Sequence, residues 1–346
     1  MIPSERSSVT VRLRYPLGLG IPQALPDQAT AQTQAASLSV PLERWAGIDL
    51  LRILAVVGII WFHTEGAPYR QIGYAGLPVF LLIFFSLVTK RGCPTTTADF
   101  LKRRWHRLLK PWLFWSAVYG LCRLVRAAHA MDLSSLGGIL SIETMLTGTC
   151  IHLWYLPYAF ASGFLVYVLN RRISRINSIS AVAGATLIGV LVLAACTVGM
   201  SRHVLMEPLP QWEFGLAAIP LGFAVGKCMT IPSRQVQGLL LLMVSGTTLA
   251  GCAILSSLGF TGLAVPYGLA MALVCLAYGW QAKANGLIAA LASLTFGIYL
   301  IHPLVIHGSK LLITPGQSHA AFIALTAGIS GLITLGLMRT PLRRFV

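Results

Sequence analysis

Asp49, Arg52 and His63 are residues whose types and spacing could do chemistry, because they interrupt an otherwise apolar stretch, residues 44–63. At about 100° per residue, the eleven steps from Arg52 to His63 bring both onto one face of a helix, roughly 20° apart. Asp49 falls within about 60° of the same line. The rise between Arg52 and His63 is about 16 Å, around half the thickness of a bilayer's hydrocarbon core.

This spacing has two interpretations. Ionisable side chains inside a membrane are costly, so they usually face a cavity and mark a functional site, where an imidazole can act as a base. Alternatively, Asp49 and Arg52 form an ion pair that anchors the end of the helix, and His63 is hydrogen-bonded to a neighbour. Other polar residues along the chain favour the functional interpretation.

The composition indicates an all-α, polytopic membrane protein that is embedded in the lipid bilayer. Of the 346 residues, 56% are hydrophobic and only 10% are charged, and the mean hydropathy is +0.75. The net charge of +16 sits in short clusters between apolar runs, which is typical of cytoplasmic loops and argues against nucleic-acid binding. The seven cysteines are scattered without paired or metal-binding spacing, so we expect neither a disulfide framework nor a metal site.

The apolar runs predict about ten membrane helices, in a domain that covers residues 44–346. Their expected ranges are 47–64, 74–89, 109–127, 153–170, 179–200, 213–228, 237–257, 262–280, 287–307 and 319–339. Residues 1–43 are rich in Pro, Gln, Ala and Ser and are expected to form a mobile cytoplasmic tail.

The distribution of Lys and Arg predicts that both termini are cytoplasmic. One side of the predicted bundle holds the basic clusters around residues 90–110, 171–175, 227–234 and 339–344. The other side has only Arg70, Arg123, Arg126, Arg202 and Lys310.

This orientation places polar side chains from several helices at a similar depth in the outer half of the membrane. They are His63, Trp154, Tyr155, Tyr299 and His302, together with His152. Each alone has an ordinary explanation, since Trp and Tyr form interfacial belts in most membrane proteins. Together they indicate a site that binds a substrate.

A basic amphipathic segment, residues 99–112, precedes the third predicted helix on the inner side. Arg103, Arg107 and Lys110 follow helical spacing, and apolar residues form the opposite stripe. The pattern alone favours an interfacial helix whose basic side chains reach lipid head groups. The functional alternative is a cradle for a phosphate-bearing ligand, for which arginine offers bidentate geometry.

The Asp-x-x-Arg pair, followed by His63 after ten intervening residues, resembles the acyltransferase-3 family of integral membrane O-acyltransferases. The resemblance covers roughly residues 44–346 and extends to an Arg-x-x-x-Arg motif at Arg103 and Arg107, where Arg104 competes for the first position. The LWYLPY and YLIHP segments, which contain Trp154, Tyr155, Tyr299 and His302, also look like this family. One departure is in the second helix, where Phe84 and Phe85 stand at the family's Ser-Gly, so local packing must differ.

The resemblance implies about ten helices and transfer of an acyl group from cytoplasmic acyl-CoA. We therefore expect an acetyl-CoA-dependent O-acetyltransferase of the bacterial inner membrane, acting on a glycan or lipid-linked sugar of an envelope or exported polysaccharide. His63 would act as the base, Arg52 with Asp49 would orient the site, and Arg103 or Arg104 with Arg107 would bind the donor phosphates. The alternative from another class is a transporter or flippase, in which Arg52 and His63 would be coupling or gating groups.

Overall fold

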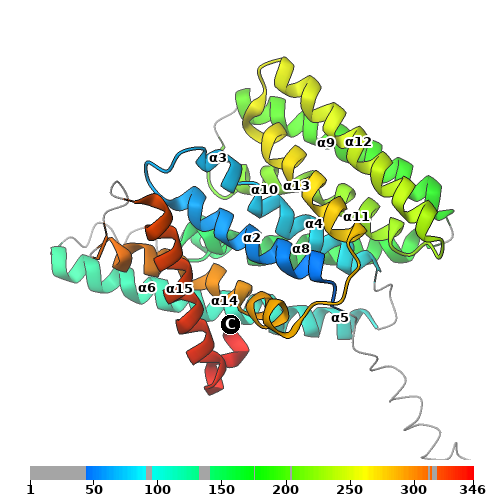
Figure 1. Cartoon of the computed structure of the whole chain (residues 1–346). Coiled ribbons are helices and arrows are strands. Elements are labelled where there is room, and N and C mark those ends of the chain that lie inside the picture. Colours follow the sequence, from blue (N-terminus) through cyan, green and yellow to red (C-terminus); the bar gives the residue numbers. More distant parts are fainter. Residues whose placement is uncertain are drawn as a thin grey trace, which may run out of the picture. The chain divides into compact units, whose positions relative to one another are not determined.

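The computed structural model describes residues 44–90, 96–131, 141–174, 176–202, 205–310, 312–313 and 318–346. The predicted tail, residues 1–43, and Cys93 lie outside these ranges. Within them the protein is built from helices, and no strand is present (Figure 1). The predicted all-α membrane bundle is therefore confirmed.

Each of the ten predicted segments is helical. The long helices are α2 (Ala46–His63), α4 (Gly76–Lys90), α6 (Lys110–Ala130), α8 (Tyr155–Arg172), α9 (Ser178–Arg202), α12 (Arg234–Ser257), α13 (Thr261–Gly279), α14 (Gly286–Ser309) and α15 (His319–Met338). Shorter helices are α3 (Arg70–Gly73), α5 (Thr97–Arg104), α7 (Ile142–Thr147), α10 (Leu209–Leu216) and α11 (Ala218–Cys228).

Eight segments in the described part of the chain are long and apolar enough to cross a membrane. The two predicted spans outside this set are α6, which carries Arg123 and Arg126 in its second half, and the pair α10 and α11. The expected range 213–228 is thus two short helices rather than one. Pro220 explains the break, because a proline ring clashes with the carbonyl four residues earlier, here that of Leu216, the last residue of α10.

A second proline shapes the basic segment that precedes α6. Between α5 and α6 the chain makes a π-helical turn, Trp105–Leu109, in which the Lys110 amide donates to the Trp105 carbonyl. Pro111 follows directly and cannot donate to the carbonyl of Arg107. The wider π turn accommodates the missing amide donor of Pro111. As a result α5, the π turn and α6 follow one another without a loop.

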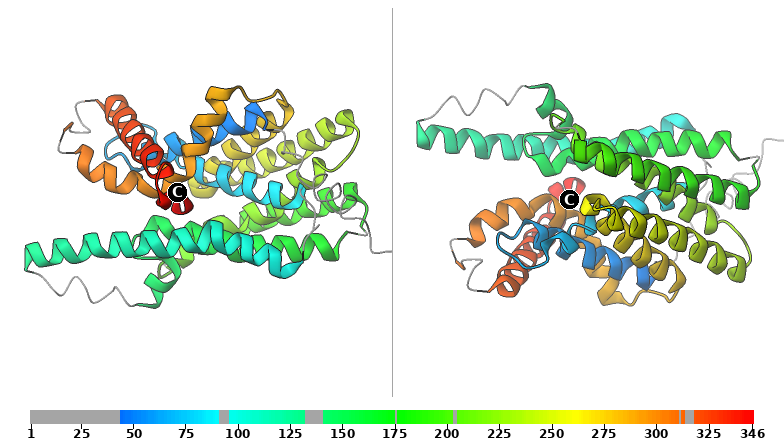
Figure 2. Two further views of the ribbon diagram at one scale, coloured as in Figure 1. Left: turned by 90° about the horizontal axis from the view of Figure 1, so that it is seen from below. Right: turned by 90° about the horizontal axis from the view of Figure 1, so that it is seen from above.

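The most deeply buried helices are α4 and α11, which pack against each other at the centre. Figure 2 shows α6, α8 and α9 in one layer and α2, α13, α14 and α15 in another. Helix α2 packs against α14 and α4, and Gly76 allows the approach of α4, because a Cβ there would lie 2.3 Å from the Ala55 carbonyl oxygen. The bundle thereby brings α2, α14 and the start of α8 together.

Candidate active site

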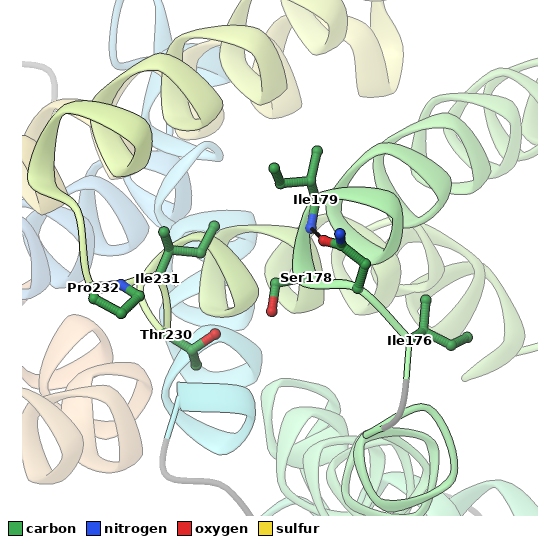
Figure 3. Close-up of a pocket in the computed structure, with 7 residues that line it drawn as sticks. Ile176, Ser178, Ile179, Thr230, Ile231 and Pro232 are labelled. Atoms are coloured by element: carbon green, nitrogen blue, oxygen red, sulfur yellow. Dashed lines mark hydrogen bonds between the residues drawn. The ribbon is translucent and has the colours of Figure 1, made fainter. Parts of the chain in front are cut away.

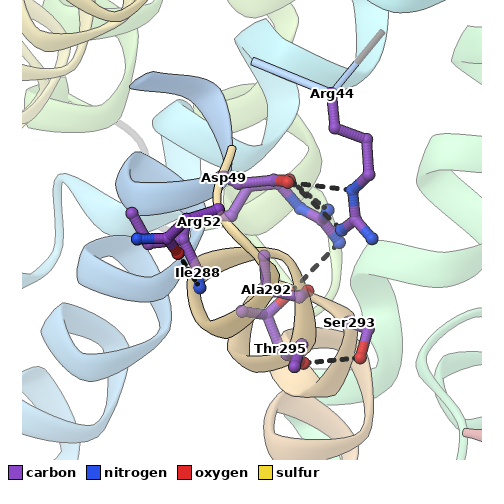
Figure 4. A network of polar contacts seen from close by, with 9 residues as sticks. Arg44, Asp49, Arg52, Ile288, Ala292, Ser293 and Thr295 are labelled. Carbon is purple, nitrogen blue, oxygen red and sulfur yellow. Dashed lines mark hydrogen bonds and ion pairs between the residues drawn. The ribbon is translucent and has the colours of Figure 1, made fainter. Parts of the chain in front are cut away.

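One end of the site is an arginine–carboxylate network at the start of α2 (Figure 4). Asp49 is buried and accepts from Arg44 Nε at 2.9 Å and from Arg52 NH1 at 3.4 Å. Arg52 NH2 also donates to the hydroxyl of Thr295 on α14 at 3.1 Å. The start of α2 is fixed by backbone bonds from Ala46 to Ala282 and from Ala284 to Arg44. Arg52 is therefore held between two helices while about a quarter of its side chain, 28%, stays accessible.

The basic segment around α5 contributes further cations to this end. The charge of Arg107 contributes to the electrostatic environment of Arg52, although less than the charges of Asp49 and Arg44 do. The guanidinium of Arg104 lies over two aromatic rings, at 4.7 Å from the centre of Phe84 and 5.2 Å from that of Phe100. The phenol of Tyr155, at the start of α8, interacts electrostatically with both Arg52 and Arg104. Arginines from α2 and α5 thus converge near one tyrosine.

Phe84 explains how the chain accommodates its departure from the family's second helix. Its ring packs on α8 at Gly163, where a Cβ would come within 2.9 Å of the ring. The small residue that permits close packing is therefore on α8 rather than on α4. The phenyl ring that fills the space on α4 supports the Arg104 guanidinium by a cation–π contact.

The other end of the site is a cluster of three imidazoles and a phenol. The ring of His302 on α14 lies 5.4 Å from that of His63 and 5.6 Å from that of His152. Tyr299 lies 6.0 Å from His302, and its hydroxyl donates to the backbone carbonyl of His152. His63 is exposed at the end of α2, whereas the other three side chains are buried.

Hydrogen bonds hold both ring nitrogens of His152 and one of His302. His302 Nδ1 lies 2.7 Å from the Tyr299 carbonyl, and His152 Nε2 lies 3.3 Å from the Leu300 carbonyl. Tyr119 of α6 donates to the same Leu300 carbonyl at 2.8 Å. His302 Nε2 is buried and has no hydrogen-bond partner in the described structure.

Two tyrosines lie between the arginine end and the imidazole end of the site. The rings of Tyr155 and Tyr299 are 5.6 Å apart, so aromatic contacts run from Tyr155 through Tyr299 to His302 and His63. The Tyr155 side chain is half-buried and makes no hydrogen bond to the part of the chain that the structure describes. Its phenol is available to a ligand lying between the cationic end and the imidazoles.

Comparison with family models decides what kind of protein has this arrangement. The model of an acyltransferase domain, that of the acyltransferase-3 family, matches residues 45–338. The chain belongs to the acyltransferase-3 family. Comparison with curated proteins and with solved structures finds no significant match to this chain. The protein is therefore a multi-pass membrane acyltransferase, as its helices and its family together show.

The structure of this acyltransferase brings together most of the residues singled out from the sequence. Asp49 and Arg52 form the expected pair, and His63, Tyr299 and His302 form one cluster. Trp154 lies at the edge of the site, where its ring contacts those of Tyr155 and Tyr158. Among the three basic candidates, Arg104 and Arg107 act electrostatically on site residues, and both Arg103 and Arg107 are exposed.

Three residues of the acyltransferase site were not assigned a role from the sequence. Arg44 is the closer partner of Asp49. Thr295 and Tyr119 reach the site from distant helices, and nothing in their local sequence distinguishes them from ordinary core residues. His152 was singled out from the sequence, but its backbone and ring contacts emerge only from the fold.

The described residues of the acyltransferase contain no group of three His, Cys, Asp or Glu side chains that could hold a metal ion. A separate open groove of about 510 Å³ lies between the start of α9 and the segment after α11 (Figure 3). None of the described residues that line it is ionisable, and they include Ser178, Thr230 and Pro232. The groove therefore offers neither a base nor a cation for acyl transfer.

Proposed function

We propose that this acyltransferase moves an acetyl group from cytoplasmic acetyl-CoA to a hydroxyl of a glycan or lipid-linked sugar on the periplasmic side of a bacterial inner membrane. The observation that carries the proposal is the continuous row of side chains from Arg104 and Arg52 through Tyr155 and Tyr299 to His302 and His63. One end suits an anionic donor, and the other end suits proton transfer. The acceptor would belong to an envelope or exported polysaccharide.

The donor's phosphates fit the cationic end. Arg104 and Arg107 would bind them, since guanidinium groups form bidentate hydrogen bonds with phosphate oxygens. The aromatic support beneath Arg104 orients its guanidinium before the ligand arrives. Arg52 is held by Asp49 and Thr295 and would contact the donor further along its length.

The reaction itself needs a base, because an alcohol attacks a thioester slowly at neutral pH. His63 would take the proton of the acceptor hydroxyl as its oxygen bonds to the thioester carbonyl carbon. The tetrahedral intermediate then expels the coenzyme A thiolate, which takes the proton back from the His63 imidazolium. The products are an ester and free coenzyme A. Attack by His63 itself, through an acyl-imidazole, is the alternative route.

An extended donor would connect the two ends. The rise along α2 from Arg52 to His63 is about 16 Å, so the pantetheine arm would lie along this helix with the nucleotide at the inner face. Tyr155 and Tyr299 flank this route. The acetyl group would then meet the acceptor without passage of the whole donor across the membrane.

The proposal is tested with purified protein, radiolabelled acetyl-CoA and sugar acceptors. We expect transfer by the wild type and a fall of about 10²–10⁴-fold for His63→Ala, because this is the usual contribution of a general base. His307→Ala is the matched control, since His307 is an exposed histidine on α14, and should retain activity. Wild-type turnover by His63→Ala would remove His63 from the mechanism. Movement of a glycan without consumption of acetyl-CoA would indicate a transporter.

A further inference from the structure

His302 carries a buried hydrogen-bond acceptor that the resting protein leaves unused. Its side chain is fully buried, at 0% exposure, and Nδ1 lies 2.7 Å from the Tyr299 carbonyl oxygen. A carbonyl oxygen can only accept, so Nδ1 carries the proton and Nε2 keeps a lone pair. Nε2 is among the buried atoms without a partner in the described structure. Burial of such an atom is costly, and each exception needs an explanation.

The neighbouring rings narrow the choice of a donor for this nitrogen. Tyr299 uses its hydroxyl proton on the backbone carbonyl of His152. His152 uses its Nε2 proton on the Leu300 carbonyl, and its Nδ1 lies 3.2 Å from the Cys150 sulfur, whose thiol can donate to it. The protons of Tyr299 and His152 are therefore already used in other hydrogen bonds.

His63 is the remaining imidazole beside His302. The two ring centres are 5.4 Å apart, a separation at which one N–H···N hydrogen bond can join two imidazoles. His63 makes no hydrogen bond to any residue that the structure describes. Helices α2 and α14 pack against each other, and the planes of the two rings are inclined at 39°.

We propose that His302 is a positioning residue that fixes the tautomer of His63. Its Nε2 accepts a hydrogen bond from one ring nitrogen of His63, which leaves the other nitrogen unprotonated and facing the acceptor hydroxyl. This inference rests on the proposed function. It gives His302 a role in orienting the base, His63, instead of a role in binding the substrate. When His63 takes the acceptor proton, the bond to His302 becomes charge-assisted and strengthens. His302 itself gains and loses no proton.

A neutral partner fits the surroundings of His63. In many hydrolases a carboxylate orients the catalytic histidine. Here Asp49 lies at the opposite end of α2 and is bound by Arg44 and Arg52. Glu65, close to His63 in sequence, is paired with Lys310 at 3.0 Å. Neither of these carboxylates is therefore free to orient the His63 imidazole, whereas Nε2 of His302 is a neighbouring acceptor without a partner in the described structure.

Two conservative substitutions separate positioning from packing. In His302→Asn the amide nitrogen can replace Nδ1 and donate to the Tyr299 carbonyl, but no atom stands at Nε2. In His302→Gln the amide oxygen reaches the place of Nε2 and can still accept. We expect His302→Asn to lower kcat by at least about 10-fold, within the ~10²–10⁴-fold contribution of the base, with KM for acetyl-CoA unchanged. His302→Gln should recover most of this loss.

A double variant shows whether His302 acts through His63. His63→Ala combined with His302→Asn should be no slower than His63→Ala alone, because residues that act as a unit are not additive. Multiplicative losses, or equal losses in the Asn and Gln variants, would overturn the proposal. If the wild type transfers no acyl group, the proposed function fails instead.

Nitrogen-15 NMR of histidine-labelled wild-type protein provides a test that needs no stable inactive variant. The His302 signals, assigned by their loss in His302→Gln, should show protonated Nδ1 and unprotonated Nε2. A protonated Nε2 could not accept from His63. Observation of that tautomer would overturn the proposal whatever the activities of the substituted proteins, because the spectrum requires only that His302→Gln folds and not that any variant turns over.

Discussion

Arg104 differs from the other basic residues of its segment in the aromatic rings beneath its guanidinium. Phe84 and Phe100 come from α4 and α5, so a cation on one helix is held by rings on two. Lys102, two residues earlier, is exposed. A guanidinium that aromatic rings already hold in place loses less side-chain entropy on binding a phosphate than a mobile guanidinium does.

We therefore expect the basic residues to differ in their effect on donor affinity. Arg104→Ala and Arg107→Ala should each raise the Kd for coenzyme A by about 10–100-fold, which corresponds to the loss of one charge-assisted contact worth roughly 1.5–3 kcal/mol. Lys102→Ala is the control from the same turn and should leave the Kd within about 2-fold. Calorimetric titration of the purified protein measures all three. Equal weakening in all three variants would indicate only a diffuse positive surface.

The helices show which part of the site can be predicted from a single sequence. Asp49, Arg52 and His63 share α2, so the period of one helix was enough to align them. Thr295, Tyr119 and the pairing of His63 with His302 depend on packing between helices, which periodicity does not encode. Pro220 could in principle have predicted the break between α10 and α11. The apolar run on both sides of it, however, resembles one continuous helix.

The close packing of α4 on α2 at Gly76 gives a prediction about the stability of the protein. A Cβ at Gly76 would lie 2.3 Å from the Ala55 backbone oxygen, so Gly76→Ala must push α4 away from α2. We expect a loss of about 1–3 kcal/mol of stability and a lower melting temperature in detergent. Gly238→Ala on α12 is the control, because a Cβ there meets open space and alanine favours the helix. An unchanged melting temperature for Gly76→Ala would show that α2 and α4 are more loosely packed.

The whole bundle determines which side of the membrane each substrate must reach. If the basic clusters mark the cytoplasmic side, Arg104 and Arg107 face the donor, and His63 and His302 lie towards the periplasm. A single reaction that uses both groups must then cross the thickness of the bundle.

This arrangement predicts a sided reaction in sealed vesicles of known orientation. With acetyl-CoA supplied only at the face of the basic clusters, the acetylated sugar should appear on the opposite face, and His63→Ala should abolish it. Acetyl-CoA supplied only at the other face should give no product. The control is detergent-opened vesicles, in which either addition should succeed. Product on the donor's own face would contradict transfer through the bundle, although His63 could still be the base.

The bond between Arg52 and Thr295 joins residues 243 positions apart in the sequence. Helices enter a membrane in the order of their synthesis, so α2 is in place long before α14 is made. During that interval Arg52 has its neighbours on α2 but not Thr295, and His63 has no His302 beside it. The proposed chemistry would therefore wait for a late step of biogenesis. A partly inserted chain would already hold the proposed base but would lack the histidine proposed to orient it.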